Sequence, residues 1–187
     1  MNRRSFLHAL PAVLAAPLAL WGCGQTMASR PGASTAAADS LQVHGDVPTF
    51  EVLDKPHEAW REVVTEDQYY ILFEEGTERR FTSDLLDNTA RGTYVCAACY
   101  LPLFPSTTKY KSGTGWPSFW APLEGSLGTK EDRSFGMIRT EYHCKRCGGH
   151  QGHVFNDGPP PTGLRYCNNG LALRFIPEDE ALPALRS

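Results

Sequence analysis

The sequence predicts a mainly β domain that begins with two short helices. Helical patterns fill residues 58–64 and 65–75 and then stop. From Thr93 onward, short segments with strand-like patterns are separated by glycine and proline, which is typical of strands joined by turns. Two Cys-x-x-Cys pairs lie in this second part, and such pairs can supply the ligands of a structural metal.

Residues at both ends define the second helix. Thr65 and Gln68 fit a capping box, in which the threonine hydroxyl accepts from the backbone N–H of Gln68 and the Gln68 side chain reaches back. Gly76 can terminate this helix, because glycine adopts the left-handed conformation common at helix ends.

Two segments, 134–144 and 170–176, carry the clearest strand patterns. In each segment alternate residues share one face that can be buried. These residues are Ile138, Thr140 and Tyr142 in the first segment and Leu171, Leu173 and Phe175 in the second. The residues after Pro177 are acidic and polar, and we expect them to form a loose tail.

The N-terminal residues predict a targeting segment. Arg3-Arg4 precedes an apolar run that is too short, and too interrupted by proline, to span a bilayer. Residues 1–23 are therefore interpreted as an export signal. Together with Phe6-Leu7, the arginine pair resembles the twin-arginine signal, and a plain secretory signal is the alternative.

Cys23 closes a sequence that resembles a lipobox, in which the cysteine is lipidated, although Trp21 departs from the small residue expected there. Cleavage elsewhere would instead leave a soluble periplasmic protein. Residues 24–46 are rich in small and polar residues and predict a flexible tether. The folded domain is then expected over residues 47–187, exported and either periplasmic or anchored to a membrane facing the periplasm.

Composition excludes one class of partner. Of the 187 residues, 41% are hydrophobic, which is enough for a core, and the formal net charge is -3. The sequence pI is about 6.1. This balance provides no electrostatic basis for binding nucleic acid.

Four cysteines form the two pairs, Cys96 with Cys99 and Cys144 with Cys147. Two such pairs can supply four thiolates to one tetrahedral zinc ion, a structural cofactor of one ion per chain. Disulfides are an alternative, because an exported protein meets oxidising conditions. A redox Cys-x-x-Cys site is another, but such sites need one pair in a βαβ setting. Two pairs in a β-rich chain favour zinc.

Cys167 remains once Cys23 and the two pairs are set aside. A single thiol of this kind is either reactive or waits for an intermolecular partner. If its segment is extended, Arg165, Cys167 and Asn169 point to the same side. The arginine can then favour the thiolate. The alternative is a buried, inert cysteine.

Several linked blocks follow one another in a characteristic order. They are GTE at 76–78, SGTGWPSF at 112–119, HQGHVFNDGPPPTGLRYCNN at 150–169 and both Cys-x-x-Cys pairs. Together they span most of residues 47–176, and they resemble one known family, the methionine-R-sulfoxide reductases. The resemblance implies two antiparallel β-sheets with short N-terminal helices and a four-cysteine zinc site. It also implies reduction of the R epimer of methionine sulfoxide, free or in proteins.

The resemblance assigns the catalytic roles. Cys167 is the nucleophile that attacks the sulfoxide sulfur and is left as a sulfenic acid. His153 and His150 are the candidates for protonating the sulfoxide oxygen, and Asn169 helps to hold the oxygen or a water. The histidines could instead ligate zinc or form a hydrogen-bonded pair in the core.

Trp116 and Phe155 are expected to wall the substrate methyl group, because an indole face is rigid and apolar. The alternative for Trp116 is a core position. Arg165 is placed beside the nucleophile and the substrate by the resemblance. A structural salt bridge from Arg165 to Asp157 would look the same in the sequence.

Thr114 marks a departure from the family pattern, because many members carry there a cysteine that resolves the sulfenic acid. We therefore expect a thioredoxin-like or small-thiol reductant to act directly on Cys167, and we expect the protein to be a monomer. Two competing functions are a zinc-binding interaction module without catalysis and a thiol oxidoreductase that acts on disulfides.

Overall fold

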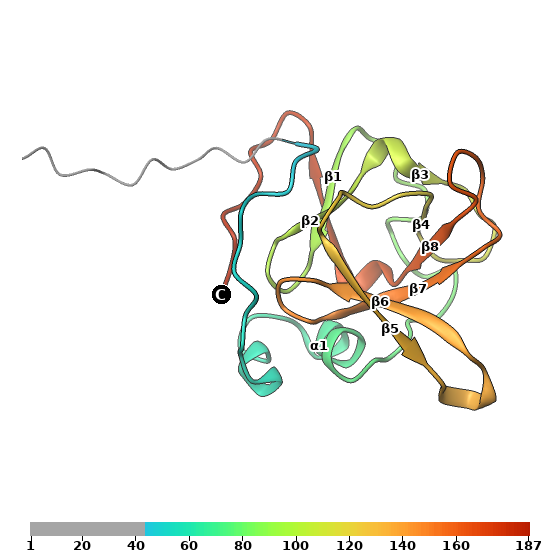
Figure 1. Ribbon diagram of the computed structural model, residues 1–187. Helices are drawn as coiled ribbons and strands as arrows, with labels where there is room; N and C mark the ends of the chain where they lie inside the picture. The colour runs from blue at the N-terminus through green and yellow to red at the C-terminus, as the bar shows by residue number, and fades with distance from the viewer. Residues whose placement is uncertain (1–43) are drawn as a thin grey trace, which may run out of the picture. The chain divides into compact units, whose positions relative to one another are not determined.

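A computed structural model describes residues 44–187 of the chain (Figure 1). The export signal predicted for residues 1–23, its Cys23 and all but the end of the tether at 24–46 lie outside the described residues. Among residues 44–187, no helix combines the length and the apolar content that crossing a membrane requires.

The domain is built on two antiparallel β-sheets, as the resemblance implied. The smaller sheet has the order β2-β1-β9, with β1 (Gly92–Cys96), β2 (Pro102–Pro105) and β9 (Leu173–Pro177). The larger sheet has the order β3-β4-β8-β7-β6-β5. Its strands are β3 (Lys109–Tyr110), β4 (Ser118–Phe119), β5 (Leu127–Asp132), β6 (Arg139–Cys144), β7 (His150–Phe155) and β8 (Arg165–Asn168).

Aromatic side chains join the two sheets. Phe104 of β2 stacks on Phe119 of β4 with ring centroids 4.2 Å apart, and Tyr94 of β1 meets the same ring edge-on at 5.0 Å. Tyr142 of β6 adds a further edge-on contact to Phe104. All four rings are fully buried, and each aromatic pair adds about 0.5–1.5 kcal/mol beyond its buried area.

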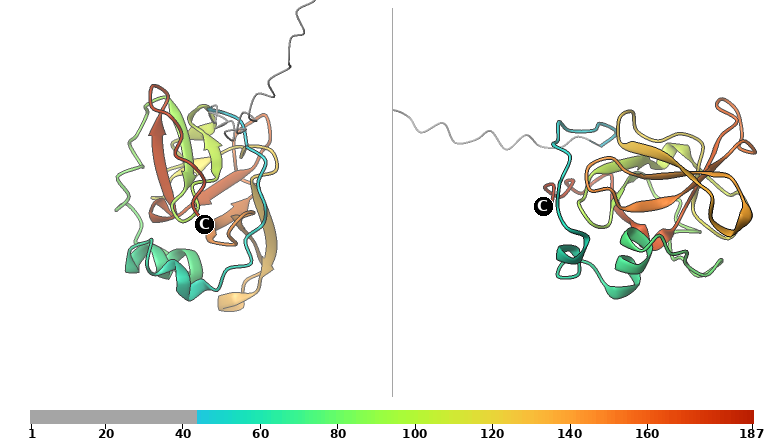
Figure 2. Two further views of the ribbon diagram at one scale, coloured as in Figure 1. Left: turned by 90° about the vertical axis from the view of Figure 1, so that its left-hand side faces the viewer. Right: turned by 60° about the horizontal axis from the view of Figure 1, so that its bottom comes forward.

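Two short N-terminal helical segments cover part of this core, namely η1 (His57–Trp60) and α1 (Glu66–Phe73). Helix α1 lies against β7 and the short turn η4 (Gly170–Ala172) (Figure 2). The predicted capping box is confirmed: the Gln68 N–H donates to Thr65 Oγ1 at 3.2 Å, and the Thr65 N–H donates to Gln68 Oε1 at 3.1 Å.

The end of α1 differs from the prediction in one respect. The left-handed residue is Glu75, with φ of 56°, and not Gly76. The Gly76 N–H instead donates to the carbonyl of Tyr70 at 3.0 Å. A Cβ atom at Gly76 would lie 2.3 Å from the Tyr70 ring, so glycine is needed here for close packing.

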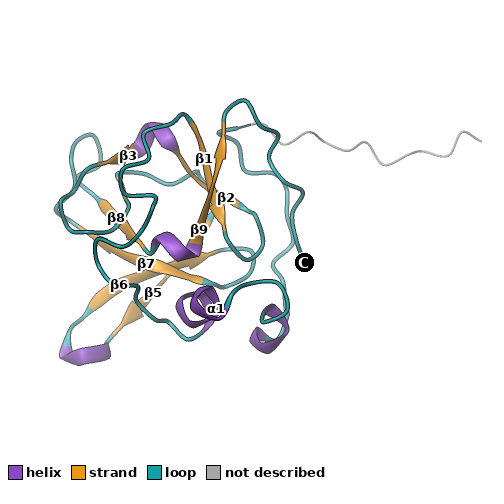
Figure 3. Cartoon of the chain, turned by 180° about the vertical axis from the view of Figure 1, so that it is seen from behind, coloured by secondary structure: helices purple, strands orange, loops and turns teal. Residues whose placement is uncertain are grey.

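Both strands predicted in the second half start later than expected. A helical turn, η3 (Ser134–Gly136), forms the tip of the β5–β6 hairpin (Figure 3), and β6 begins only at Arg139. Ile138 is consequently 70% exposed, and its predicted burial is wrong. Likewise η4 precedes β9, so Leu171 lies outside the strand and is 38% exposed. The alternation of polar and apolar residues continues through both turns, so the sequence predicted strand where the structure has a helical turn.

The predicted loose tail is also wrong, because the C-terminal residues pack onto the domain. Leu182 is buried. The Arg186 guanidinium donates to the carbonyls of Ala97 and Ala98, each at 2.7 Å, and the Arg186 carbonyl accepts from Arg146 at 2.5 Å. One guanidinium has several donors, so a tail without secondary structure is still held by main-chain carbonyls.

Candidate metal centre and active site

The four paired cysteines lie in two hairpin turns that belong to different sheets. Cys96 and Cys99 lie at the turn between β1 and β2, and Cys144 and Cys147 lie at the turn between β6 and β7. In each turn, the residue four positions after the first cysteine donates its N–H back to that cysteine's carbonyl, at 3.0 Å and 2.9 Å. Both donor residues are left-handed, with φ of 63° at position 100 and 74° at position 148.

The four thiol sulfurs converge on one point. All lie within 4.8 Å of one another, with 3.6 Å between Cys96 and Cys147 and 3.5 Å between Cys99 and Cys144. A disulfide would need about 2.05 Å. Four sulfurs at 2.3 Å from one ion lie roughly 3.8 Å apart. Burial raises the pKa of the Cys96 and Cys144 thiols, so a cation is needed to hold them as thiolates. The cluster is positioned to bind a metal, as predicted.

Gln151 links this cluster to the larger sheet. Its side chain is fully buried and donates to Cys96 Sγ at 3.6 Å. Its backbone carbonyl accepts from both the N–H and the side-chain amide of Asn169, at 2.8 Å and 3.1 Å. The metal end of the domain is thereby connected to the segment that follows Cys167.

Strand register positions Cys167. On the central strand β8, Cys167 lies opposite His153 of β7 on one side and Ser118 of β4 on the other. Residues directly opposite in an antiparallel pair point to the same face. Gly152 permits this register, because a Cβ atom there would lie 1.9 Å from the Cys167 carbonyl oxygen.

A cavity of about 110 Å³ opens over this face of the sheet. It contains five of the predicted site residues, Cys167, His153, Asn169, Trp116 and Phe155. The other lining residues are Thr77, Arg139, Gly152 and Asn168. His150 and Arg165 do not line it, although both contact residues that do. The predicted site residues are therefore brought together, with these two in supporting positions.

Cys167 is partly buried and is held mainly as a thiol. Burial raises the pKa of Cys167 above its ordinary value, and the nearby Arg165 charge and Thr114 hydroxyl only partly oppose this effect. Thr114 belongs to a chain of hydroxyls, since Ser112 Oγ lies 2.9 Å from Thr114 Oγ1 and 2.7 Å from Ser118 Oγ. The sequence indicated that Arg165 can favour the thiolate. Its charge alone does not keep Cys167 deprotonated in the free enzyme.

Arg165 forms the salt bridge that was the alternative interpretation, and it also acts on Cys167. Its guanidinium forms two parallel bonds to Asp157, at 2.8 Å and 2.9 Å. It also lies 4.3 Å from the ring centroid of Phe155, and its charge lowers the pKa of Cys167. The salt bridge holds the arginine in place, where it lies against Phe155 and acts on Cys167.

Each histidine faces its own carboxylate. His153 Nε2 lies 2.8 Å from Asp132 Oδ2. His150 Nδ1 lies 3.0 Å from Glu141 Oε1, at an angle outside good hydrogen-bond geometry, and both of these side chains are only 3% exposed. The two imidazoles meet edge to face with centroids 5.4 Å apart. Neither histidine belongs to the cysteine cluster, so the zinc-ligand alternative is not supported.

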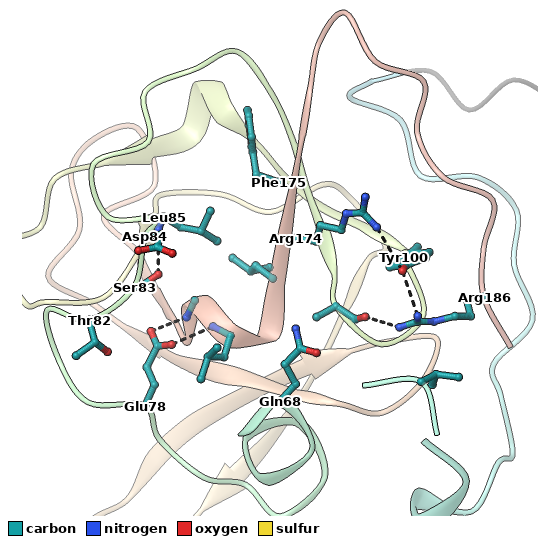
Figure 4. Close-up of a pocket in the computed structure, with 15 residues that line it drawn as sticks. Gln68, Glu78, Thr82, Ser83, Asp84, Leu85, Tyr100, Arg174, Phe175 and Arg186 are labelled. Atoms are coloured by element: carbon teal, nitrogen blue, oxygen red, sulfur yellow. Dashed lines mark hydrogen bonds between the residues drawn. The ribbon is translucent and has the colours of Figure 1, made fainter. Parts of the chain in front are cut away.

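Glu78 is a site residue that the motif contained but that received no predicted role. Its backbone carbonyl accepts from the Trp116 indole at 3.1 Å, and its backbone N–H donates to Asn169 Oδ1 at 3.1 Å. Its carboxylate accepts from the backbone N–H groups of Gly170 at 2.6 Å and Leu171 at 2.9 Å (Figure 4). Glu78 thus connects Trp116 to the segment that follows Cys167.

Asn169 is more constrained than the prediction supposed, since both ends of its amide bond backbone groups. Asp132, Arg139 and Glu141 also had no predicted role in the site. No local pattern identified these residues, because they reach the histidines only through the register of β5, β6 and β7.

Comparison with known proteins agrees with this geometry. The SelR domain profile matches residues 64–177. The peptide methionine sulfoxide reductase MsrB of Leptospira interrogans is 55% identical over 130 residues, which cover 69% of this chain and 98% of the relative. The MsrB of Agrobacterium fabrum is 52% identical over 69% of the chain and 96% of the relative, and that of Methanosarcina barkeri is 49% identical over 70% and 92%. The chain therefore belongs to the SelR family of MsrB-type methionine-R-sulfoxide reductases, as its motifs implied.

Proposed function

We propose that this protein reduces methionine R-sulfoxide to methionine through a sulfenic acid on Cys167, and that it repairs oxidised proteins in the cell envelope. The observation that carries the proposal is the register that sets Cys167 directly opposite His153. Both residues face a cavity walled by Trp116 and Phe155. A nucleophile, a proton donor and an apolar wall are the groups that sulfoxide reduction needs.

The protonation states suggest how the step begins. Burial raises the pKa of Cys167 and lowers the pKa of His153, so both are mostly neutral in the free enzyme. A proton moved from the thiol to the imidazole produces the attacking thiolate and the proton donor together. No proton has to come from bulk water.

The thiolate attacks the sulfoxide sulfur and forms an S–S bond to the substrate, while His153 protonates the sulfoxide oxygen. The S–O bond of the substrate breaks as the hydroxyl transfers to Cys167 Sγ, and the S–S bond breaks with its electron pair on the methionine sulfur. Cys167 is left as a sulfenic acid. Methionine sulfur gains the two electrons that Cys167 loses. The buried ring of His150 packs edge to face on the ring of His153. It keeps the His153 imidazole in place and completes the proton relay.

Substrate placement follows from the cavity walls. The indole of Trp116 is fixed through its N–H to the Glu78 carbonyl, so one rigid apolar face is presented to the methyl group. Arg165 supports the opposite wall at Phe155. Asn169, which lines the same cavity, provides the polar side toward the oxygen. A chiral sulfur bound between a methyl wall and a proton donor is accepted in one epimer.

Regeneration of Cys167 then requires an external thiol. The Thr114 hydroxyl lies near Cys167 and cannot form a disulfide. One external thiol attacks the sulfenic acid and releases water, and a second reduces the mixed disulfide. A thioredoxin-like protein or a small thiol fits this role. Mass spectrometry after one turnover without reductant should show a sulfenic acid or its adduct, and an internal disulfide of Cys167 would contradict the scheme.

The metal at the four-cysteine cluster is proposed to be one structural zinc ion. Four buried sulfur donors that all lie within 4.8 Å of one another suit zinc, which prefers four thiolates in a structural site. Bound there, the ion joins the hairpins of the two sheets and takes no part in the reaction.

Export is proposed from the Arg3-Arg4 pair and the apolar run that follows, with Cys23 as a lipid anchor and residues 24–46 as the tether. The protein then acts as a monomer facing the periplasm. Fractionation of cells that carry Cys23→Ser tests the anchor, because the variant should move from the membrane to the soluble periplasmic fraction.

The deciding experiment assays both epimers of a peptide methionine sulfoxide with excess dithiothreitol, using the purified full chain and Cys167→Ser. Turnover of the R epimer alone, abolished by the substitution, is the expected result. A folded, metal-loaded protein that turns over neither epimer would favour the binding-module function. Reduction of protein disulfides in place of sulfoxides would favour the oxidoreductase.

A further inference from the structure

We infer that Asp132 is a positioning residue for the reaction, which fixes the tautomer of His153 and raises its affinity for a proton. This inference rests on the proposed function and adds a residue to it. The two residues come from different strands, Asp132 from the end of β5 and His153 from the middle of β7. They meet across β6, which lies between these strands in the sheet.

The contact is short and well supported. Asp132 Oδ2 lies 2.8 Å from His153 Nε2 and also accepts from Arg139 Nη2 at 2.5 Å. Its second oxygen accepts from the Ser134 backbone N–H at 2.8 Å. The Asp132 and His153 side chains are each only 14% exposed. Arg139, which bonds the same oxygen as the imidazole, and the turn at Ser134, which bonds the other oxygen, therefore hold the carboxylate in place.

The direction of the hydrogen bond determines the tautomer. Hydrogen bonds from Ser134, and further from His153 and Arg139, keep the pKa of Asp132 far below its usual range, so Asp132 is ionised and can only accept. The neutral imidazole must therefore carry its hydrogen on Nε2. Its Nδ1 is left as the atom that gains and gives up the catalytic proton, and we find no partner for it within residues 44–187.

Several charges act on His153, and they oppose one another. Arg139 and the neighbouring His150 disfavour the imidazolium, as does burial, which is the largest effect. Asp132 favours it. Two further ionisable residues face His153. Glu141 lies opposite it on β6, and Cys167 lies opposite it on β8. The Glu141 carboxylate is engaged by His150 and Lys130, so Asp132 is the carboxylate that acts directly on His153.

The chemical consequence concerns the step in which a proton leaves Cys167. A carboxylate that compensates for burial favours the imidazolium over the neutral imidazole. The fraction of enzyme with thiolate and imidazolium together falls as the pKa of His153 falls, and the rate falls with it. An amide at position 132 would keep the shape of the site and remove this compensation.

The test uses Asp132→Asn, with Glu131→Gln as the matched control. Glu131 is the adjacent acidic residue of β5, and its carboxylate is exposed and pairs with Arg133 at 2.5 Å. We expect kcat/KM on the R-sulfoxide to fall about ten- to a hundredfold in Asp132→Asn and to stay unchanged in Glu131→Gln. The pKa of His153, followed by NMR, should fall in the first variant only, and the acid limb of the pH–rate profile should move to lower pH with it.

NMR of the wild-type imidazole supplies a readout that needs neither a variant nor activity. Hydrogen on Nε2 in the neutral form is expected, and hydrogen on Nδ1 would overturn the inference. An unchanged His153 pKa in a folded Asp132→Asn would overturn it as well, even if the rate fell. If the wild type reduces neither epimer, the proposed function fails, and the two NMR results still decide whether Asp132 controls His153.

Discussion

The four cysteines of the metal centre and Cys167 lie in contrasting surroundings. The four cysteines of the metal centre are at most 6% exposed, lie at hairpin turns and have one another as close neighbours. Cys167 is partly exposed, lies within a central strand, and has as neighbours an arginine, hydroxyls and a histidine. In the proposed function, the same side chain is a permanent ligand in one place and a transient nucleophile in the other.

The difference shows that the extent of burial and the neighbouring groups together decide what a thiol does. At the metal centre burial is complete, so the thiolates are stable only with a cation and are inaccessible to other partners. At Cys167 burial is partial, and the same effect raises the pKa without closing the cavity. The thiol is therefore protected until a substrate and a neighbouring base draw off its proton.

The largest effect is expected from breaking the metal centre. Cys144→Ser should lose the ion and unfold the domain, since structural zinc contributes about 10–16 kcal/mol in small domains and whole domains are stable by about 5–15 kcal/mol. Metal content and circular dichroism check this. Cys167→Ser is the control and should keep one ion per chain and the wild-type melting temperature. A Cys144→Ser protein that melts like the wild type would rule out a structural ion.

Chemical modification sharpens the same comparison. In the native, metal-loaded protein, iodoacetamide should label Cys167 roughly a hundredfold or more faster than the other four domain cysteines, which react only when the structure opens. Peptide mass spectrometry identifies the labelled sites. Chelation in denaturant should make all five equally reactive. Early labelling of Cys99 or Cys147 would show that the two regions are not separated in this way.

A smaller effect is expected from the cation beside the nucleophile. Arg165→Met removes a charge that lowers the pKa of Cys167, so the pKa should rise further and less thiolate should be present at pH 7. Alkylation of Cys167 at pH 7 should slow about three- to tenfold, and its pH midpoint should move upward. Arg91→Met, at an exposed arginine paired with Glu178, should change neither value.

The smallest effect is expected from the docked C-terminal segment. Arg186→Ala removes the donors to the carbonyls of Ala97 and Ala98 and should lower the free energy of unfolding by about 1–3 kcal/mol. Thermal melting measures the change. Arg174→Ala is the matched control, since Arg174 is exposed and both arginines lie over the ring of Tyr100, Arg186 at 4.3 Å and Arg174 at 5.5 Å from its centroid. Equal losses in both variants would mean that the main-chain bonds of Arg186 contribute little.

Features that depend on residues close together in the sequence could be predicted, and features that depend on contacts between distant strands could not. The capping box of Thr65 and Gln68 is local, and it formed as expected. The cysteine pairs carry their own spacing, and the metal cluster followed from them. By contrast, the contact of Asp132 with His153 depends on the register of three strands, which no local pattern in this chain specifies.

The same limit explains the errors. Ile138 fits the alternation of a strand, but the turn η3 removes it from the buried face. Arg186 binds carbonyl oxygens, and every residue has one, so its docking site has no signature in the sequence. Side chains that act on the main chain are therefore the least predictable part of this fold.

The spacing of the metal ligands has a consequence for chain entropy. Cys99 and Cys144 are 45 residues apart, and the bound ion closes this stretch into a loop. By the relation for a covalent cross-link, closing it in the unfolded chain removes entropy worth roughly 4 kcal/mol at 25 °C. The loop contains Trp116 and Asp132, whereas His153 and Cys167 lie beyond it. An ion bound there would thus act as a cross-link, which limits how far the part of the cavity within the loop can move from the part beyond it before folding is complete.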